Sequence, residues 1–291
     1  MAGTLIIIGG HEDRKDKKLI LREVARRVGR RKLVVTTVAS REPDGTFEEY
    51  RDIFRGFGIE CAELEIRARG DALEPENIDV INDATALFFT GGDQLKITSQ
   101  IGDTPIFSRL REIYEQGGLI AGTSAGASVV CETMLIGGPG EESHRSDHNL
   151  RMAPGLAFFK DAIVDQHFAE RGRFGRLLGA VARNPRNLGI GIDEDTAIVV
   201  ENGESFYVVG SGAVYVLDGR NLTYSNIGEE ENYHTLSVFR LMTHVLSQGD
   251  RFHLASREPQ PGEREEIEET VMSATGANGN GRPRSRKKND D

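Results

Sequence analysis

The stretch LIAGTSAGASVV (residues 119–130) decides the fold, because it joins an apolar run to a helical pattern through a turn of very small residues. LIAG predicts a buried strand, and SAGASVVCETML (residues 124–135) predicts the helix that follows it. Ser124 lies between the two, inside the pattern Gly-x-Ser-x-Gly. In a strand–turn–helix context this pattern is typical of a nucleophile elbow, whose strained turn projects a serine hydroxyl from the sheet edge.

The small residues around Ser124 have two explanations. They allow the strand and helix to approach closely, and they leave the N–H groups at the helix start, beginning with that of Ala125, free to face a developing oxyanion. The alternative is a serine that only caps the helix, beside glycines that only serve packing. The surrounding pattern of strands and helices favours the nucleophile.

Short apolar runs alternate with longer amphipathic segments through the first half of the chain. This alternation predicts an α/β fold with a mostly parallel sheet, covered by helices on both faces, and with the functional loops at the carboxyl ends of the strands. Three of these loops are GGHEDR, TGGDQ and GTSAG. The predicted strands are 4–10, 32–40, 59–66, 84–92 and 119–122, and the predicted helices are 17–29, 47–58, 75–82, 107–118 and 124–135.

The second half of the chain is richer in strand patterns. Residues 188–219 contain two turn signals between β-branched and aromatic runs, which predicts an antiparallel extension of the same sheet. A final helix is expected within residues 234–249. From Arg257 the chain is rich in Gly, Pro, Asn and charge, so we expect one catalytic α/β domain over residues 1–256 and a disordered polar tail over 257–291.

The composition excludes some partners. The 291 residues include 46 carboxylates and 36 Lys and Arg, a net charge of -10, which disfavours nucleic acid as a partner. No run approaches the roughly 20 apolar residues of a membrane span, and the N-terminal run is too short for a signal peptide, so we expect a cytoplasmic protein without membrane contact. Cys61 and Cys131 are far apart without metal-ligand spacing, and the sequence predicts neither a metal site nor a cofactor.

A serine nucleophile needs a base, and His167 has the best position for one. It directly follows the apolar run AIV, where a strand would end beside the other loops. A carboxylate must then orient the base, and the segment GIGIDEDTA offers three that spacing alone does not separate: Asp193, Glu194 and Asp195. The remaining histidines have no comparable position: His11, His144 and His148 in loops, and His234, His244 and His253 in or near the predicted last helix.

Two further patterns bear on the chemistry. The order serine, histidine, acid disfavours the α/β-hydrolases, which place the acid before the histidine. Three arginines, Arg171, Arg173 and Arg176, follow the predicted base closely. Guanidinium groups bind carboxylates in bidentate fashion, so these residues predict an aspartate-rich ligand. The alternative is that they only form the charged start of a helix.

Taken together, seven segments resemble the cyanophycinase family of serine peptidases, which is related to the α-aspartyl dipeptidases. The resemblance implies a class I glutamine amidotransferase-like (flavodoxin-like) three-layer sandwich. His11 is the one departure within these segments, because a small residue is expected there. In chain order, over about residues 4–220, the segments are IIIGGHEDR, TVASREPDG, FFTGGDQ, AGTSAGA, MAPGLAF, VDQHFAERGRFGRL and GIGIDEDTA.

The resemblance also implies residue roles. Ser124 is expected to be the nucleophile, His167 the base and Glu194 the orienting acid. Gly92 is expected to supply an oxyanion N–H beside that of Ala125. The residues implied to line the substrate pocket are Gln94, Asp165, Gln166, Arg171, Arg173 and Arg176.

The implied substrate is cyanophycin, a poly-aspartate backbone that carries arginine on its β-carboxyl groups, and the implied product is the β-Asp-Arg dipeptide. Asp165 would accept a substrate guanidinium, and the arginines would bind substrate carboxylates. The resemblance further implies a homodimer without metal. The alternatives are an α-aspartyl dipeptidase and a non-catalytic binding module on the same scaffold; a serine instead of cysteine at the elbow disfavours a glutamine amidotransferase.

Overall fold

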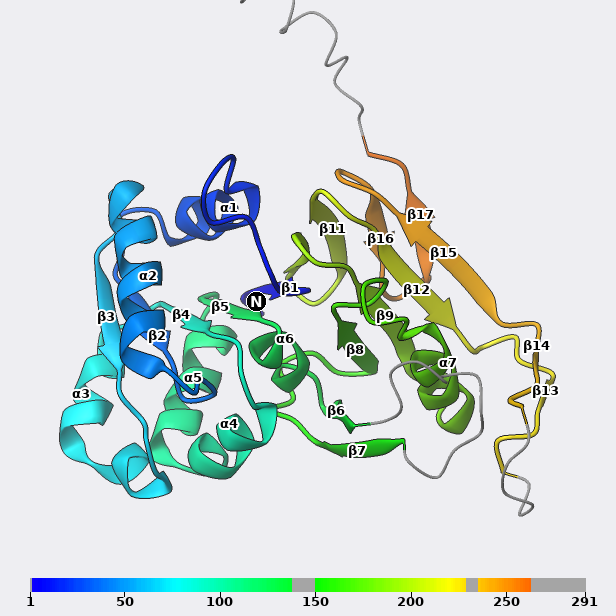
Figure 1. Ribbon diagram of the computed structural model, residues 1–291, viewed down its shortest axis with the longest axis horizontal. Coiled ribbons are helices and arrows are strands. Elements are labelled where there is room, and N and C mark those ends of the chain that lie inside the picture. The colour runs from blue at the N-terminus through cyan, green and yellow to red at the C-terminus, as the bar shows by residue number, and fades with distance from the viewer. Residues whose placement is uncertain (1, 138–149, 229–234, 263–291) are drawn as a thin grey trace, which may run out of the picture.

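The centre of the molecule is a nine-stranded sheet, seen in a computed structural model that describes residues 2–137, 150–228 and 235–262 (Figure 1). Its parallel part runs in the order β1 (Thr4–Ile8), β5 (Leu119–Thr123), β4 (Ala86–Phe89), β2 (Leu33–Thr36) and β3 (Cys61–Leu64). On the other side of β1 the sheet continues with antiparallel strands: β10 (Thr196–Glu201), β11 (Ser205–Gly210), β16 (Arg251–His253) and β17 (Glu258–Gln260).

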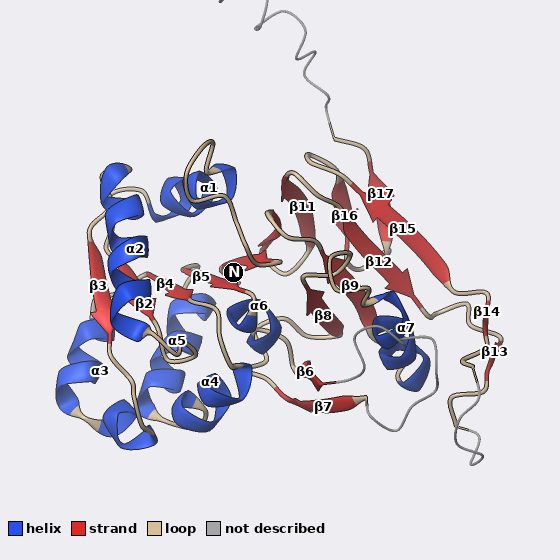
Figure 2. Cartoon of the chain, viewed as in Figure 1, coloured by secondary structure: helices blue, strands red, loops and turns tan. Residues whose placement is uncertain are grey.

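Helices cover both faces of the parallel part, which confirms the predicted three-layer α/β architecture (Figure 2). Strand β1 shows how its sequence produces this arrangement, because alternate side chains point to opposite faces. Ile6 and Ile8 pack in the core that contains α1 (Leu19–Val28) and α2 (Pro43–Gly56). Leu5 and Ile7 pack in the opposite core, whose helical elements are η1 (Arg69–Leu73), α3 (Pro75–Asn82), α4 (Gln94–Ile101), α5 (Pro105–Glu115) and α6 (Ala125–Val129).

A second sheet of four strands lies beside the first. Its order is β15 (Met242–Leu246), β12 (Val214–Asp218), β9 (Leu188–Ile192) and β8 (Ala162–Gln166), with β8 and β9 parallel. Val164 of β8 belongs to the main core, whereas Ile163 packs with α7 (Phe174–Arg183). The prediction that residues 188–219 extend the first sheet is therefore correct for β10 and β11 only. Strands β9 and β12 pair with each other in the second sheet instead.

The predicted helix over 234–249 is wrong. The described part of this segment, from residue 235, forms β14 (Val238–Phe239), which pairs with β13 (Tyr224–Ser225), and β15, which pairs antiparallel with β12. Val245 is 63% exposed and its neighbour Leu246 is buried, which is the alternation of a half-buried strand. A short apolar run can follow either period, and here the distant partner β12 decides.

Two boundaries also differ from prediction. The helix expected over 124–135 ends at Val129, and β6 (Thr133–Gly137) then pairs with β7 (Arg151–Pro154). The tail expected from residue 257 begins instead with strand β17, whereas residues 263–291 lie outside the described part. None of the described helices combines the length and apolar character that crossing a membrane requires.

Candidate active site

The turn between β5 and α6 holds Ser124 in a strained backbone conformation. Its φ is +53° and its ψ is -105°, a region that costs a non-glycine residue on the order of 1–3 kcal/mol. The Ser124 N–H donates a hydrogen bond to the carbonyl of Ile8 at 3.0 Å. A Cβ on Gly122 would lie 2.4 Å from the carbonyl oxygen of Gly126, so glycine is what allows strand and helix to meet this closely. The turn has the backbone that its sequence pattern predicts.

Ser124, His167 and Glu194 form one chain of hydrogen bonds, although they follow three different strands, β5, β8 and β9. The Oγ of Ser124 lies 2.9 Å from Nε2 of His167. On the other side of the ring, Nδ1 lies 2.6 Å from Oε1 of Glu194. The carboxylate accepts a hydrogen bond from a protonated Nδ1, and this tautomer leaves the Nε2 lone pair facing the serine hydroxyl. This is the arrangement in which an imidazole can take the serine proton.

Burial of His167 keeps its imidazole ready to act as a base. The residue is 2% exposed, and this desolvation lowers its pKa below 6.5 by disfavouring the charged form. The hydrogen bond to Glu194 opposes this shift, and the positive charge of Arg171 adds to it. The ring is therefore neutral at neutral pH and able to accept a proton.

Only one of the three candidate carboxylates contacts His167. Asp193 instead accepts hydrogen bonds from the N–H groups of Ala169 and Ala213. Asp195 accepts from the N–H of Asp13 at 2.8 Å and from the Ser211 hydroxyl. Both aspartates hold loops in place, and Glu194 alone is in reach of the base, as the family resemblance implies.

The loop after β1 ties the three segments of this site together. The carbonyl of Gly9 accepts a hydrogen bond from the His167 N–H at 2.8 Å, and the carbonyl of Gly10 accepts one from the Asp195 N–H at 2.9 Å. His11 extends the network, because its Nδ1 lies 2.9 Å from Oε2 of Glu194. The GGHEDR segment therefore sets the spacing between base and acid, which its sequence alone does not reveal.

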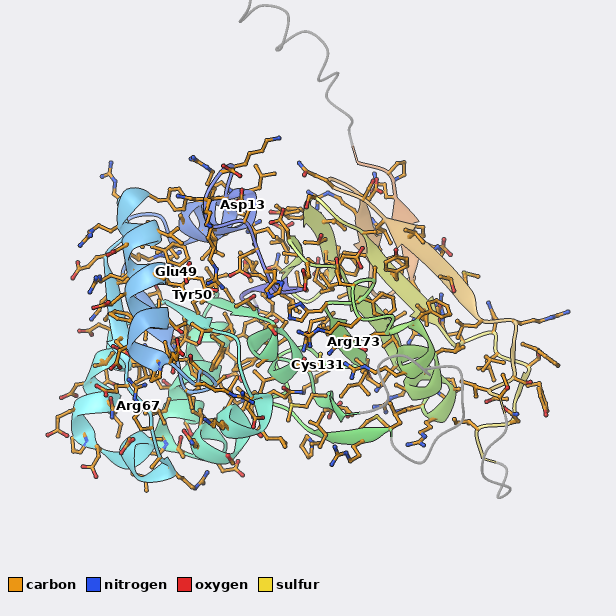
Figure 3. The ribbon with its side chains drawn as sticks, in the orientation of Figure 1. Asp13, Glu49, Tyr50, Arg67, Cys131 and Arg173 are labelled. Carbon is orange, nitrogen blue, oxygen red and sulfur yellow. The ribbon has the colours of Figure 1, made fainter. Side chains whose placement is uncertain are left out.

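Glu12, from the same loop, is a buried carboxylate directly beneath the turn. Its Oε2 accepts the Thr123 hydroxyl at 2.6 Å, one residue before the nucleophile. Its Oε1 accepts the Tyr50 hydroxyl and an Arg14 N–H. Burial beside this carboxylate raises the pKa of Tyr50 well above its usual value, which keeps the phenol a donor. Figure 3 places Tyr50 and Glu49 on α2, facing the loop that carries Asp13.

A cavity of about 530 Å³ opens over Ser124 and His167. Gly91 and Gly92 form part of its wall, and a Cβ on Gly91 would lie 3.4 Å from the Cβ of Ser124. Gly92 has a φ of +140° and its Cα packs against the Ala39 carbonyl, a position that only glycine fits. Of the residues implied to bind substrate, those in the wall are Gln94, Gln166, Arg171, Arg173 and Arg176.

Asp165 differs from expectation. Its carboxylate is 1% exposed and does not belong to the cavity wall. Arg176 donates to it from Nε at 2.6 Å and from Nη2, and Arg173 donates from Nη1 at 3.2 Å. The interpretation that Asp165 receives a guanidinium from substrate is therefore wrong, because the chain's own arginines already occupy it.

The three arginines consequently differ in function. Figure 3 shows Arg173 in the middle of the molecule, where burial lowers its pKa to about 10, so that it remains charged at neutral pH. The guanidinium of Arg171, by contrast, is exposed and has no hydrogen-bond or ion-pair partner among the residues that the structure describes. Arg171 is thus the guanidinium best able to bind an incoming carboxylate.

Sequence reasoning missed several residues of this site. His11, Arg14, Thr123, Leu135 and Ile136 all line the cavity. The motif GGHEDR carried the signal for the first two, but their direction depends on tertiary contacts. Contrary to the sequence expectation, three possible metal ligands meet here among the described residues: His11, His167 and Glu194. Of the other histidines, His244 is on β15 and His253 on β16, whereas His144, His148 and His234 lie outside the described residues.

Comparison with known proteins identifies the family of this chain. Residues 5–208 match the model of peptidase family S51. Cyanophycinases from Trichormus variabilis and Synechococcus elongatus are 41% and 37% identical over 263 residues, 89% of this chain and 88% and 81% of theirs. The crystal structure of a peptidase from an acI-B1 actinobacterium shares the fold with a TM-score of 0.61 at 22% identity, covering 84% of this chain and 98% of that one. The chain belongs to peptidase family S51.

Proposed function

We propose that this protein is a cyanophycinase, a serine-type exopeptidase that releases β-Asp-Arg dipeptides from cyanophycin. The observation that carries the proposal is the chain of hydrogen bonds from Ser124 through His167 to Glu194, at the floor of a cavity that also contains Arg171. Curated relatives that are 36–41% identical to this chain along most of its length are cyanophycinases.

The geometry supports acyl transfer to water. The Ser124 Oγ attacks the carbonyl carbon of a backbone aspartyl amide as its proton passes to Nε2 of His167. The N–H groups of Gly92 and Ala125 stabilise the oxyanion. His167 then gives its proton to the leaving amine, and the C–N bond breaks to leave an ester on Ser124. Water attacks this ester, again with His167 as base, and restores the free serine.

The charges of the cavity suit a substrate with free carboxylates. Arg14, Arg171, Arg173 and Arg176 lie in the wall of a pocket on a chain of net charge -10. Arg14, Arg173 and Arg176 are already engaged by acidic side chains, which leaves Arg171 for the substrate. A guanidinium fork binds a carboxylate with two parallel hydrogen bonds, so Arg171 suits the free carboxylate that each arginine of cyanophycin carries.

Gln94 and Gln166 complete the polar wall. The side-chain N–H of Gln94 donates to the Leu135 carbonyl at 3.0 Å, which leaves its oxygen as an acceptor. Gln166 accepts from the buried Arg173 guanidinium at 3.0 Å. Fixed amide groups of this kind can bind the arginyl guanidinium and the peptide groups of cyanophycin in the role that sequence reasoning assigned to Asp165.

The family relationship leads us to extend the proposal to assembly and location. We infer a cytoplasmic homodimer that acts without metal and without nucleic acid or membrane as a partner. Sedimentation equilibrium of the purified chain tests the dimer, and fractionation of cells that express it tests the location.

One assay separates the proposal from its alternatives. The purified chain is offered insoluble cyanophycin and, in parallel, a simple Asp-X dipeptide, and the released products are identified by mass spectrometry. A cyanophycinase releases β-Asp-Arg from the polymer and leaves the dipeptide intact. Cleavage of the dipeptide alone would indicate an α-aspartyl dipeptidase, and binding of the polymer without cleavage would indicate a binding module.

A further inference from the structure

His11 places a third possible metal ligand beside the hydrogen-bonded residues His167 and Glu194. One ring nitrogen of His11, one ring nitrogen of His167 and a carboxylate oxygen of Glu194 all lie within 4.8 Å of one another. Each imidazole already contacts a different oxygen of the same carboxylate, at 2.9 Å for His11 and 2.6 Å for His167. Two imidazoles and one carboxylate form the ligand set of many zinc sites that keep a fourth position for water.

We propose that His11, His167 and Glu194 bind one Zn²⁺ ion and that this ion inhibits the peptidase. The proposed inhibition rests on the peptidase function proposed above, whereas the proposed zinc binding does not. Imidazole and carboxylate donors favour zinc over magnesium or calcium, which prefer oxygen ligands alone. The adjoining cavity gives the ion access and can supply water as the fourth ligand.

Zinc binding requires the three ligand atoms to move only slightly closer together. Zinc–nitrogen bonds of about 2.0–2.1 Å place the ligands of a tetrahedral site about 3.4 Å apart. The His11 side chain is 69% exposed and can move toward the ion, whereas His167 is almost fully buried. The pair of rings already meets edge to face, with centroids 5.0 Å apart. His11 is therefore the adjustable ligand, and the other two are held in place.

Two charged residues near these ligands have opposite effects on the binding of a cation. The carboxylate of Glu170 accepts the Glu194 N–H at 3.2 Å, which fixes this segment and adds negative charge. Arg171 is close enough to His167 to influence its charge and would repel a cation. We therefore expect binding that is reversible by a chelator.

Inhibition follows from the two nitrogens of His167. In the tautomer that catalysis requires, Nδ1–H donates a hydrogen bond to Glu194, and Nε2 is the free base facing Ser124. A zinc ion on Nδ1 takes that lone pair, so the ring proton must reside on Nε2. No net proton is lost from the ring, but Nε2 becomes a donor and cannot accept the proton of Ser124.

Isothermal titration calorimetry of Zn²⁺ with the full chain carrying Ser124→Ala measures the affinity and stoichiometry of the site in the absence of turnover. His11→Asn is the critical variant, because the Asn amide can still donate to Glu194 but is a poor zinc ligand. We expect one ion per chain, and at least about 10-fold weaker binding when His11→Asn is added. His253→Ala, which removes an exposed histidine bound to Gln260, should leave the affinity unchanged.

Three results would overturn the proposal. The first is equal affinity with and without His11→Asn, and the second is loss of binding in His148→Ala, which would assign the ion to the sequence pair His144 and His148. The third is one bound ion per chain with full peptidase turnover.

The expected result is that Zn²⁺ inhibits dipeptide release and that a chelator reverses the inhibition. The His11→Asn variant should need at least about 10-fold more zinc for the same inhibition. If the chain releases no dipeptide at all, the titration still decides the site.

Discussion

Gly10 lies directly against the imidazole of His167. A Cβ built on Gly10 would be 2.3 Å from Cε1 and 2.5 Å from Nε2 of that ring, and the φ of Gly10 is +100°. The same residue accepts a hydrogen bond from Asp195 through its carbonyl. The base is therefore positioned by contact with a bare backbone on one side and by Glu194 at its end.

Gly10→Ala should consequently impair catalysis. The added methyl must push the imidazole away from Ser124, and a displacement of about 1 Å can cost roughly 100-fold in rate. Steady-state kinetics of dipeptide release measure this loss. Gly29→Ala is the matched control, because Gly29 also has a positive φ of +65° but a Cβ there would meet nothing within 4 Å. It should lose about 1 kcal/mol of stability and keep its activity; equal activity of both variants would contradict the positioning role.

Glu12→Gln should weaken the support beneath the nucleophile. The amide replaces one acceptor with a donor where Thr123 and Tyr50 both donate, so we expect a loss of about 1.5–3 kcal/mol in the free energy of unfolding. Denaturant unfolding measures it. Glu49→Gln is the control, since Glu49 also pairs with Arg14 but is half exposed, and it should cost less than about 1 kcal/mol. Similar losses in the free energy of unfolding for the two variants would show that burial does not make the contacts of Glu12 more stabilising than the exposed ion pair of Glu49.

Arg171→Ala should raise KM for cyanophycin and leave the melting temperature unchanged. Its guanidinium has no partner among the described residues, so its removal takes away a substrate contact of about 1.5–3 kcal/mol, roughly 10-fold or more in KM. Arg176→Ala should instead lower the stability as well, because it leaves Asp165 buried with one guanidinium fewer. If Arg171→Ala lost stability and kept its KM, Arg171 would be structural.

The pH dependence of activity should follow His167. Burial lowers its pKa below 6.5, so the neutral, active ring persists to lower pH than in a free histidine. Activity is full above 6.5 and declines only as the pH falls through the lowered pKa; the contribution of this group to stability has the same sign. The kcat/KM profile, recorded with a chelator present, gives the midpoint. Arg171→Ala removes a repelling charge and should move the midpoint up toward 6.5, whereas a wild-type midpoint at or above 6.5 would contradict the assignment.

The sequence was sufficient to predict the elements nearest the site. Apolar runs predicted β1 and β5 close to their observed positions, the run AIV predicted that a strand ends before His167, and glycine patterns predicted the turn at Ser124. These features are local, because period, turn chemistry and close packing depend on neighbouring residues. For the same reason the helix over 75–82 was predicted at its observed position as α3.

What the sequence did not reveal depends on distant partners. Whether residues 242–246 form a helix or a strand is decided by β12, and whether Asp165 faces substrate is decided by Arg173 and Arg176, which reach back to it from the start of α7. The contact between His11 and Glu194 joins residues that are far apart in the chain. No local pattern encodes such contacts, so a metal-ligand cluster was not predicted.

Dipeptide release from purified cyanophycin by the wild-type chain and by Ser124→Ala, at equal concentrations of folded protein, tests the central claim most directly. The wild-type chain should release β-Asp-Arg. The variant should lose at least about 10⁴-fold in kcat with an unchanged melting temperature, because no other hydroxyl takes over the attack. Undiminished release by Ser124→Ala would contradict the mechanism outright.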